Sequence, residues 1–278
     1  MSLLDGAWFV GCGNMAGAMI EGWRQAGVDL GNAVAIRPSG REVPGVRVVT
    51  SPAEAGPPPQ LVILGFKPQQ LDAAAPGLAG LVTPQTTIVS ILAGVETTGI
   101  RQRFPGARAV IRALPNLPVA MRRGVVALFS TDAPKDVRES VSQLFAMLGY
   151  TIWTNNEAGL AAVGSVAGAG PAYVARFIDA LAKAGVDRGL SFETASTIAL
   201  ETVLGTAWMA ASTRESMDSL AQRVASPGGT TEAGLAILDR EDVLDKLVSL
   251  TISAASRRGA ELAAEARRPK LAESALLP

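Results

Sequence analysis

The stretch Trp8-Phe9-Val10-Gly11-Cys12-Gly13-Asn14-Met15-Ala16 decides the fold of this chain. Its apolar start predicts a buried strand, and the glycines predict a tight turn into a helix. The pattern matches the dinucleotide motif G-x-G-x-x-G/A: Gly11 permits the turn, Gly13 lets a pyrophosphate approach, and Ala16 is the small residue where helix meets strand. A second apolar run, residues 33–36, follows at the distance expected of the next strand. We therefore predict that the cofactor is contacted by Gly11, Gly13, Asn14, Met15 and Ala16. The alternative is a purely structural turn.

A basic turn follows the second predicted strand. Arg37, Ser39 and Arg41 lie where an NAD-preferring protein usually carries an Asp or Glu for the ribose 2′-hydroxyl. Two guanidinium groups and a hydroxyl can instead surround a 2′-phosphate. The turn predicts that NADP(H) is preferred and NAD(H) possible, with a solvated basic turn as the alternative.

Strand-like runs continue to alternate with helical patterns over about the first 150 residues, which predicts an α/β fold with a doubly wound parallel sheet. The runs are residues 60–66, 87–92, 109–114 and 124–129. In such sheets, ligands bind at the carboxyl ends of the strands. The residues at those ends that we expect to contact the cofactor are Lys67, Pro68, Ala93, Gly94 and Asn116. For Lys67, a structural ion pair is the alternative.

The composition changes after residue 154, where long helical patterns replace the strands. We predict a Rossmann domain over residues 1–154 and an all-helical domain for dimerisation and substrate binding over residues 155–278. Residues 158–175 carry no charge, but their glycines and alanines make them a poor membrane span. Small residues let helices or subunits approach closely. We therefore predict that this domain forms a homodimer, and the alternative is a monomeric helical core.

The loop Ala225-Ser226-Pro227-Gly228-Gly229-Thr230-Thr231 combines two glycines with three hydroxyls and contains no acid or base. Its backbone N–H groups can converge on a carboxylate, and a helix beginning near Thr230 would add its dipole. The loop predicts an anion site, with an ordinary Pro-Gly turn as the alternative.

Composition excludes several classes of chemistry. The 278 residues contain 25 basic and 25 acidic side chains, no histidine and one cysteine. The absence of histidine excludes Ser-His-Asp hydrolysis and histidine-ligated zinc catalysis within one chain, and the single cysteine excludes an internal disulfide. We expect no metal site, no nucleic-acid partner and no membrane partner. The amino-terminal residues lack the pattern of a signal peptide, which predicts a cytoplasmic protein.

Together these motifs resemble the pyrroline-5-carboxylate reductase family over nearly the whole chain. The segments that carry the resemblance are 9–16, 67–69, 90–94, 112–118, 168–173 and 226–231. The resemblance implies an enzyme that transfers a hydride from NADPH to the imine carbon of pyrroline-5-carboxylate, giving L-proline in the last step of proline biosynthesis. It also implies helices that interlock with those of a second subunit, and often a pentamer of dimers, which is a decamer.

The resemblance also assigns roles in the glycine loop. It implies that backbone N–H groups of Gly229, Thr230 and Thr231 hold the substrate carboxylate, and that the Thr231 hydroxyl contacts the ring nitrogen. Thr231 is accordingly the predicted catalytic residue. The predicted substrate-binding residues are Ser226, Gly228, Gly229, Thr230 and Thr231.

The chain departs from the family pattern where hydroxyls or an acid are usual. The replacements are Leu117, Ala161, Gly164, Ala167 and Ala169. These losses leave open a reductase of another cyclic imine, or an inactive NADP-binding scaffold. A hydroxy-acid reductase on the same fold is a further alternative, and Lys183 is then the candidate catalytic lysine.

Overall fold

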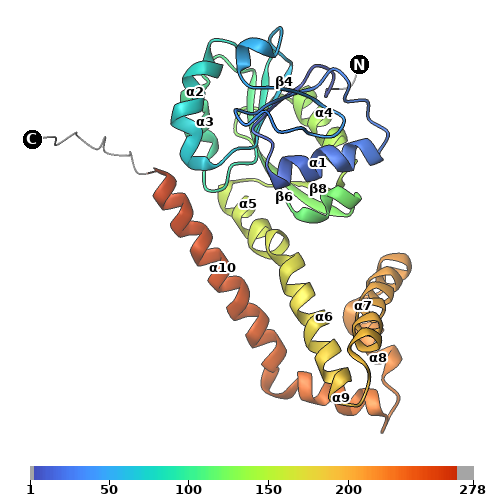
Figure 1. The fold of residues 1–278 in the computed structure, drawn as a ribbon. Helices are drawn as coiled ribbons and strands as arrows, with labels where there is room; N and C mark the ends of the chain where they lie inside the picture. Colours follow the sequence, from blue (N-terminus) through green and yellow to red (C-terminus); the bar gives the residue numbers. More distant parts are fainter. Residues whose placement is uncertain (1–2, 268–278) are drawn as a thin grey trace, which may run out of the picture. The chain divides into compact units, whose positions relative to one another are not determined.

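The computed structural model describes residues 3–267, drawn as a ribbon in Figure 1. The described chain forms two compact units, of which the first comprises residues 3–169 and 255–267 and the second Gly170–Ala254. The predicted division between residues 154 and 155 was placed where strands give way to helices. The two units are instead defined by which residues contact one another. Leu160 packs with Ala127 and Phe129 of the sheet, so the first helix after residue 154 belongs with the first unit. The functional division at 154 stays a prediction.

An eight-stranded sheet forms the centre of the first unit, with the order β3-β2-β1-β4-β5-β6-β7-β8. The strands are β1 (Trp8–Val10), β2 (Val34–Ile36), β3 (Arg47–Val49), β4 (Leu61–Leu64), β5 (Thr87–Ser90), β6 (Ala109–Pro115), β7 (Gly124–Phe129) and β8 (Gly149–Trp153). This order of the first six strands is that of a doubly wound dinucleotide-binding sheet, and the predicted α/β class is confirmed.

Two details of the sheet differ from the prediction. The sheet is not fully parallel, because β7 runs antiparallel to β6. Only the short segment between Pro115 and Gly124 joins these strands, and a parallel return needs a crossover of a dozen or more residues. β3 was also not predicted, because it begins with an exposed arginine and has one buried residue, whereas all residues of the equally short β1 and β2 are buried and apolar.

Helices cover both faces of the sheet. In the first unit they are α1 (Asn14–Gln25), η1 (Pro52–Glu54), η2 (Pro68–Gln70), α2 (Leu71–Ala79), α3 (Thr97–Arg103), η3 (Leu117–Met121), α4 (Lys135–Ala146), α5 (Glu157–Val163) and a π-helical turn, η4 (Gly164–Gly168). Alternate strand residues face opposite layers: Phe9 packs in the core under α1 and α4, and Trp8 and Val10 in the core under α2 and α3. Figure 1 shows α1 and α4 on one side of the sheet and α2 and α3 on the other.

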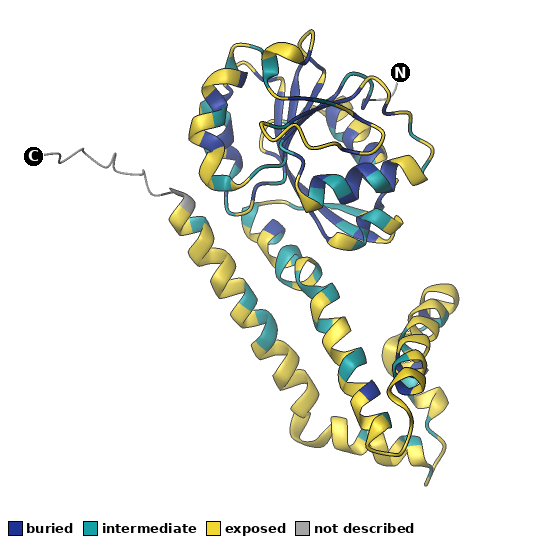
Figure 2. Ribbon diagram, viewed as in Figure 1, coloured by how far each residue is buried: buried dark blue, intermediate teal, exposed yellow. Residues whose placement is uncertain are grey.

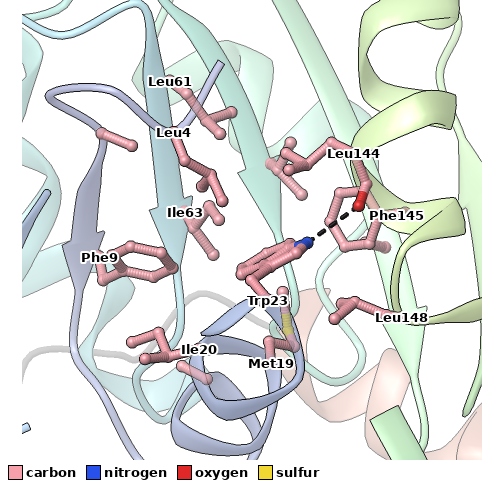
Figure 3. Packing of buried hydrophobic residues seen from close by; sticks show 14 of the residues in the cluster. Leu4, Phe9, Met19, Ile20, Trp23, Leu61, Ile63, Leu144, Phe145 and Leu148 are labelled. Atoms are coloured by element: carbon pink, nitrogen blue, oxygen red, sulfur yellow. Dashed lines mark hydrogen bonds between the residues drawn. The ribbon is translucent and has the colours of Figure 1, made fainter. Parts of the chain in front are cut away.

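Trp23 anchors α1 to the sheet and to α4. Its side chain is fully buried, and its indole N–H donates to the Leu144 carbonyl over 2.9 Å (Figure 3). The Phe145 ring meets the indole edge-on with 5.7 Å between ring centroids. A buried indole needs such an acceptor. The carboxyl-terminal part of α1 is therefore attached to a packed core, and the glycine motif precedes the other end of this helix.

The second unit has little core of its own. Its helices are α6 (Gly170–Val186), α7 (Phe192–Thr213), α8 (Met217–Val224), α9 (Thr230–Leu238), η5 (Arg240–Asp242) and α10 (Val243–Arg267), whose last part belongs to the first unit. Its only cluster of buried residues in the described chain is Ala182, Ala195 and Ala199, where α6 meets α7. Large apolar side chains stay exposed on these helices, as the mostly yellow ribbons of Figure 2 show; Phe192 is 67% exposed and Leu250 69%. Apolar surface of this extent requires another surface to cover it.

Within the described chain, one helical stretch is long and apolar enough to cross a membrane by length and composition alone, namely Glu157–Val186. Its mean hydropathy is 1.3, and it is interrupted by the π-helical turn η4.

Candidate functional site

The turn after β1 requires glycine at its first position. Gly11 has φ +73°, and a methyl group there would lie 2.7 Å from the Phe66 Cβ. The Gly11 N–H donates to the Ile36 carbonyl over 2.9 Å, which ties the turn to the end of β2. Backbone angle, packing and hydrogen bonding thus fix the same turn.

The amino terminus of α1 is open for an anion. Gly13 is its N-cap residue, and neither a side-chain cap nor an acid in the first turn covers the helix end. A methyl group on Gly13 would meet only the Gly65 carbonyl at 4.0 Å, so the space above it is free. Ala16 is buried and faces Gly65, where a methyl group would lie 3.2 Å from the Ala16 Cβ. These residues fit a dinucleotide pyrophosphate at a helix amino terminus. Asn14 is exposed beside Gly13, and Met15 is partly buried.

The basic turn is compact and accessible. The Arg37 guanidinium donates to the Arg41 carbonyl over 3.1 Å, and the Arg41 N–H to the Ser39 hydroxyl over 3.4 Å. Ser39 and Arg41 are exposed and Arg37 is half-buried. The arrangement places two positive charges and a hydroxyl at the carboxyl end of β2, as a 2′-phosphate site requires.

Cys12 joins the glycine turn to the core. Its side chain is buried, and burial raises the pKa of the thiol above its usual 9.0, an effect that the charge of Arg37 partly opposes. The thiol therefore stays protonated at neutral pH and is a packing group rather than a nucleophile.

Two predicted cofactor segments follow β4 and β5. Lys67 is exposed and makes no ion pair with any described residue, which removes the structural alternative for this side chain within residues 3–267. A cavity of about 550 Å³ is bordered by Pro68, Ala93 and Gly94. The end of α10 also borders it, and a methyl group on Gly94 would lie 3.1 Å from the Leu262 carbonyl oxygen.

The Asn116 side chain makes hydrogen bonds to two backbone groups of the protein. It is buried, its amide N–H donates to the Ala167 carbonyl over 3.0 Å, and its amide oxygen accepts from the Val125 N–H over 2.8 Å. The side chain thereby holds the π-helical turn η4 against the end of β6. Its predicted contact with the cofactor stays a prediction. At η4 a methyl group on Gly164 would lie 3.3 Å from the Leu114 side chain, so a larger residue there would displace Leu114.

The glycine loop of the second unit leads directly into α9, which begins at Thr230. Gly228 has φ +71° with open space around its Cα, and the Gly229 N–H donates within the turn to the Ser226 carbonyl over 2.9 Å. Within the described chain, the backbone N–H groups of Thr230 and Thr231 have no hydrogen-bond partner. Two of the three N–H groups predicted to hold a carboxylate are therefore available, and that of Gly229 is engaged in the turn.

An acid that was not predicted from the sequence lies at this loop. Glu232 lies in the first turn of α9, and its carboxylate accepts the Gly228 N–H over 2.7 Å. A charged group of the chain itself thus occupies part of the predicted anion site. An acid three residues beyond the paired glycines, in the first turn of the expected helix, was the signal available in the sequence.

The structure brings one predicted group together. The glycine turn, the basic turn, Lys67-Pro68, Ala93-Gly94 and Asn116 follow β1, β2, β4, β5 and β6, and these neighbouring strands are parallel, so their ends meet at one edge of the sheet. The loop of residues 226–231 belongs to the second unit. Lys183 lies in the last turn of α6 and donates to Asp179 over 2.8 Å in an exposed pair, which does not favour a catalytic lysine.

Comparison with known proteins connects both units to one family. A family model described as pyrroline-5-carboxylate reductase dimerisation matches residues 157–262. The chain is 37% identical to the pyrroline-5-carboxylate reductase of Pseudomonas aeruginosa over 92% of its own length and 96% of that protein. A structure of a pyrroline-5-carboxylate reductase from Coxiella burnetii superposes with a TM-score of 0.85 at 30% identity, covering 93% of this chain and 98% of that one. A Plasmodium falciparum pyrroline carboxylate reductase with NADP bound shares the fold, with a TM-score of 0.81 at 22% identity and coverage of 92% and 97%.

Proposed function

The chain belongs to the pyrroline-5-carboxylate reductase family, and from that membership we propose that it reduces pyrroline-5-carboxylate to L-proline with NADPH. The observation that carries the proposal is that the similarity covers 92% of the chain and that the matched dimerisation family model, residues 157–262, includes the glycine loop. The chemistry is a hydride transfer to the imine carbon, which makes the protein an oxidoreductase of proline biosynthesis.

The first unit holds the cofactor in this proposal. The open amino terminus of α1 binds the pyrophosphate, and Arg37, Ser39 and Arg41 bind the 2′-phosphate. The reduced nicotinamide, when bound, supplies the hydride. NADH lacks the 2′-phosphate and forfeits the two guanidinium contacts, so it is the weaker cofactor.

The second unit holds the substrate. The N–H groups of Thr230 and Thr231 and the dipole of α9 bind the carboxylate, and the Thr231 hydroxyl contacts the ring nitrogen. The imine nitrogen carries its proton before reaction, so hydride addition at carbon gives the secondary amine without a general acid. A chain without histidine suits this reaction, because orientation is its main requirement.

The protein is a homo-oligomer in this proposal, because the exposed apolar helices of the second unit are covered by those of a second copy. We extend the proposal to a pentamer of dimers and to a cytoplasmic location. Light scattering coupled to size-exclusion chromatography distinguishes dimer from decamer, and fractionation of the native cells tests the location.

The test is oxidation of NADPH by the purified protein with and without pyrroline-5-carboxylate. Thr231→Ala should lower kcat/KM by about 10- to 100-fold, because it removes a hydrogen bond to a charged group, and Thr231→Ser should restore most of the rate. Arg37→Ala with Arg41→Ala should raise the KM for NADPH by a similar factor and leave that for NADH unchanged.

The outcomes separate the alternatives. Tight NADPH binding without turnover would refute the reductase proposal for this imine. Turnover with a six-membered cyclic imine carboxylate in its place would point to the replaced hydroxyls at residues 117, 164, 167 and 169. Absence of turnover with any imine would indicate the scaffold.

A further inference from the structure

One carboxylate in the first unit receives donors from two separate elements. Glu157, the first residue of α5, accepts the Thr97 backbone N–H over 2.9 Å and the Thr97 hydroxyl over 3.1 Å at the same oxygen, Oε1. Its other oxygen accepts from the Arg112 guanidinium in β6. Sixty residues separate Glu157 from Thr97 along the chain, so these bonds fix tertiary and not local structure.

Arg112 fixes the position of this carboxylate. Arg112 stands in β6 between the buried residues Ile111 and Ala113, and it is only 9% exposed. A buried guanidinium without a counter-charge is strongly unfavourable, so the pair with Glu157 is required wherever Arg112 is buried. The ion pair therefore holds the Glu157 carboxylate, and the other oxygen of that carboxylate accepts from Thr97 of α3.

Thr97 begins α3, and the carboxylate of Glu157 caps that helix from outside. The local N-cap residue, Glu96, does not cap α3 with its side chain, and α3 has no acid in its first turn. Glu157 supplies both an acceptor for an unpaired N–H and a negative charge at the positive end of the helix.

The segment between β5 and α3 contains Ala93 and Gly94, the predicted cofactor residues. It is held at its start by strand bonds, with the Ile91 N–H donating to the Leu64 carbonyl over 3.0 Å. At its end it is held by Glu157 through Thr97. We propose that Glu157 is a positioning residue for the cofactor, acting through Thr97 on the Ala93-Gly94 loop, with Arg112 as its counter-charge. The inference rests on the proposed function and on the predicted contact between this loop and NADPH.

A second carboxylate offers a matched control. Asp132 holds the other end of α3, where it accepts from Arg101 over 2.8 Å, and it also accepts the Val110 N–H over 3.0 Å. Both carboxylates join α3 to the neighbouring sheet, but only Glu157 lies at the end that leads into the loop. A purely structural role predicts the same consequences for the loss of either one.

The experiment measures NADPH binding directly, by fluorescence titration, together with thermal unfolding. Glu157→Gln should weaken NADPH binding by about 5- to 20-fold, as loss of a charged cap and its loop contact predicts. Asp132→Asn should lower the melting temperature and leave the NADPH dissociation constant within about 2-fold of the native value. Glu157→Asp, which keeps the charge, should recover part of the affinity.

A second variant separates positioning from stability. Arg112→Met combined with Glu157→Met removes both charges at once, a change that often leaves stability nearly intact. It should keep the melting temperature near that of the native protein and still lose NADPH affinity, and it carries the test if Glu157→Gln does not fold. Native affinity in the double variant, or equal losses in Glu157→Gln and Asp132→Asn, would overturn the proposal. NADPH binding is measured without turnover. Failure to reduce pyrroline-5-carboxylate would therefore refute the proposed reaction, but the comparison of NADPH affinities among the variants would still be valid. A native protein that binds no NADPH would refute the inference.

Discussion

Two helix amino termini are predicted to bind anions in this protein, and they are built differently. The turn that leads into the amino terminus of α1 is fixed by packing: Gly11 lies against Phe66, and Trp23 fixes the helix itself to α4. The end of α9 is an exposed turn, held by the Gly229 bond to Ser226 and by Glu232. The first is preformed by packing, and the second depends on local hydrogen bonds. We expect the same substitution to have unequal effects at the two ends.

The largest expected effect is that of alanine at two glycines with the same backbone angle. Gly11 has φ +73° and Gly228 has φ +71°, so each substitution incurs the left-handed cost of about 1–2 kcal/mol. At Gly11 the methyl group also overlaps Phe66, which adds about 1–3 kcal/mol, whereas Gly228 has open space. Gly11→Ala should lower the melting temperature by several degrees and abolish tight NADPH binding.

Gly228→Ala should instead raise the KM for the imine by about 5- to 30-fold, since its smaller cost falls on an exposed loop. Its melting temperature should change little. Thermal unfolding and steady-state kinetics on both variants check the pair. Equal losses of stability at the two glycines would show that packing does not distinguish the two ends.

Next in size is a comparison within α1. Gly13→Ala places a methyl group in the space predicted for the pyrophosphate, and should weaken NADPH binding by about 5- to 100-fold with little change in stability. Gly17→Ala, one turn later, meets no atom within 4 Å and should stabilise the helix by about 0.5–1 kcal/mol. Calorimetric titration with NADPH checks the affinity of both variants, and thermal unfolding checks their stability. Normal NADPH binding by Gly13→Ala would show that the pyrophosphate does not bind at this site.

The two helix amino termini also show which features of the fold were predictable from the sequence. The α1 end was predictable, because a strand, a glycine turn and a helix occur consecutively and each has a local signal. The start of α9 followed equally from the glycine loop. The antiparallel β7 was recoverable from its short connection, which leaves no room for a crossover. β3 had no such signal, because it begins with an exposed arginine and only one of its residues is buried.

Tertiary pairings were beyond the sequence. A buried arginine such as Arg112 needs a counter-charge, but Glu157 lies 45 residues away and no spacing rule selects it. The engagement of the Gly229 N–H within its own turn likewise depends on the exact backbone path. Local periodicity predicts elements, and it does not predict which polar groups those elements bring together.

A smaller effect is expected from Glu232, which occupies the Gly228 N–H at the α9 end. Glu232→Gln removes a negative charge from the helix end that receives the substrate carboxylate, and should lower the KM for the imine by about 2- to 5-fold. Glu193→Gln removes an exposed acid from the first turn of α7 and serves as the control. A raised KM in Glu232→Gln would mean that this side chain supports the loop rather than competing with the substrate.

The smallest effect concerns pH at the α1 end. The pKa of the buried Cys12 thiol is raised above its usual 9.0, so the folded protein retains a proton that the unfolded chain releases. The resulting stabilisation is complete below pH 9.0 and is lost as pH rises through the folded pKa. Urea midpoints of the native protein should therefore fall more steeply above pH 9.0 than those of Cys12→Ala, in which other titrations are unchanged. Parallel pH profiles of the two proteins would show that the packing around Cys12 does not hold its proton. In Arg37→Ala the opposing charge is absent, so the steep fall should extend to higher pH.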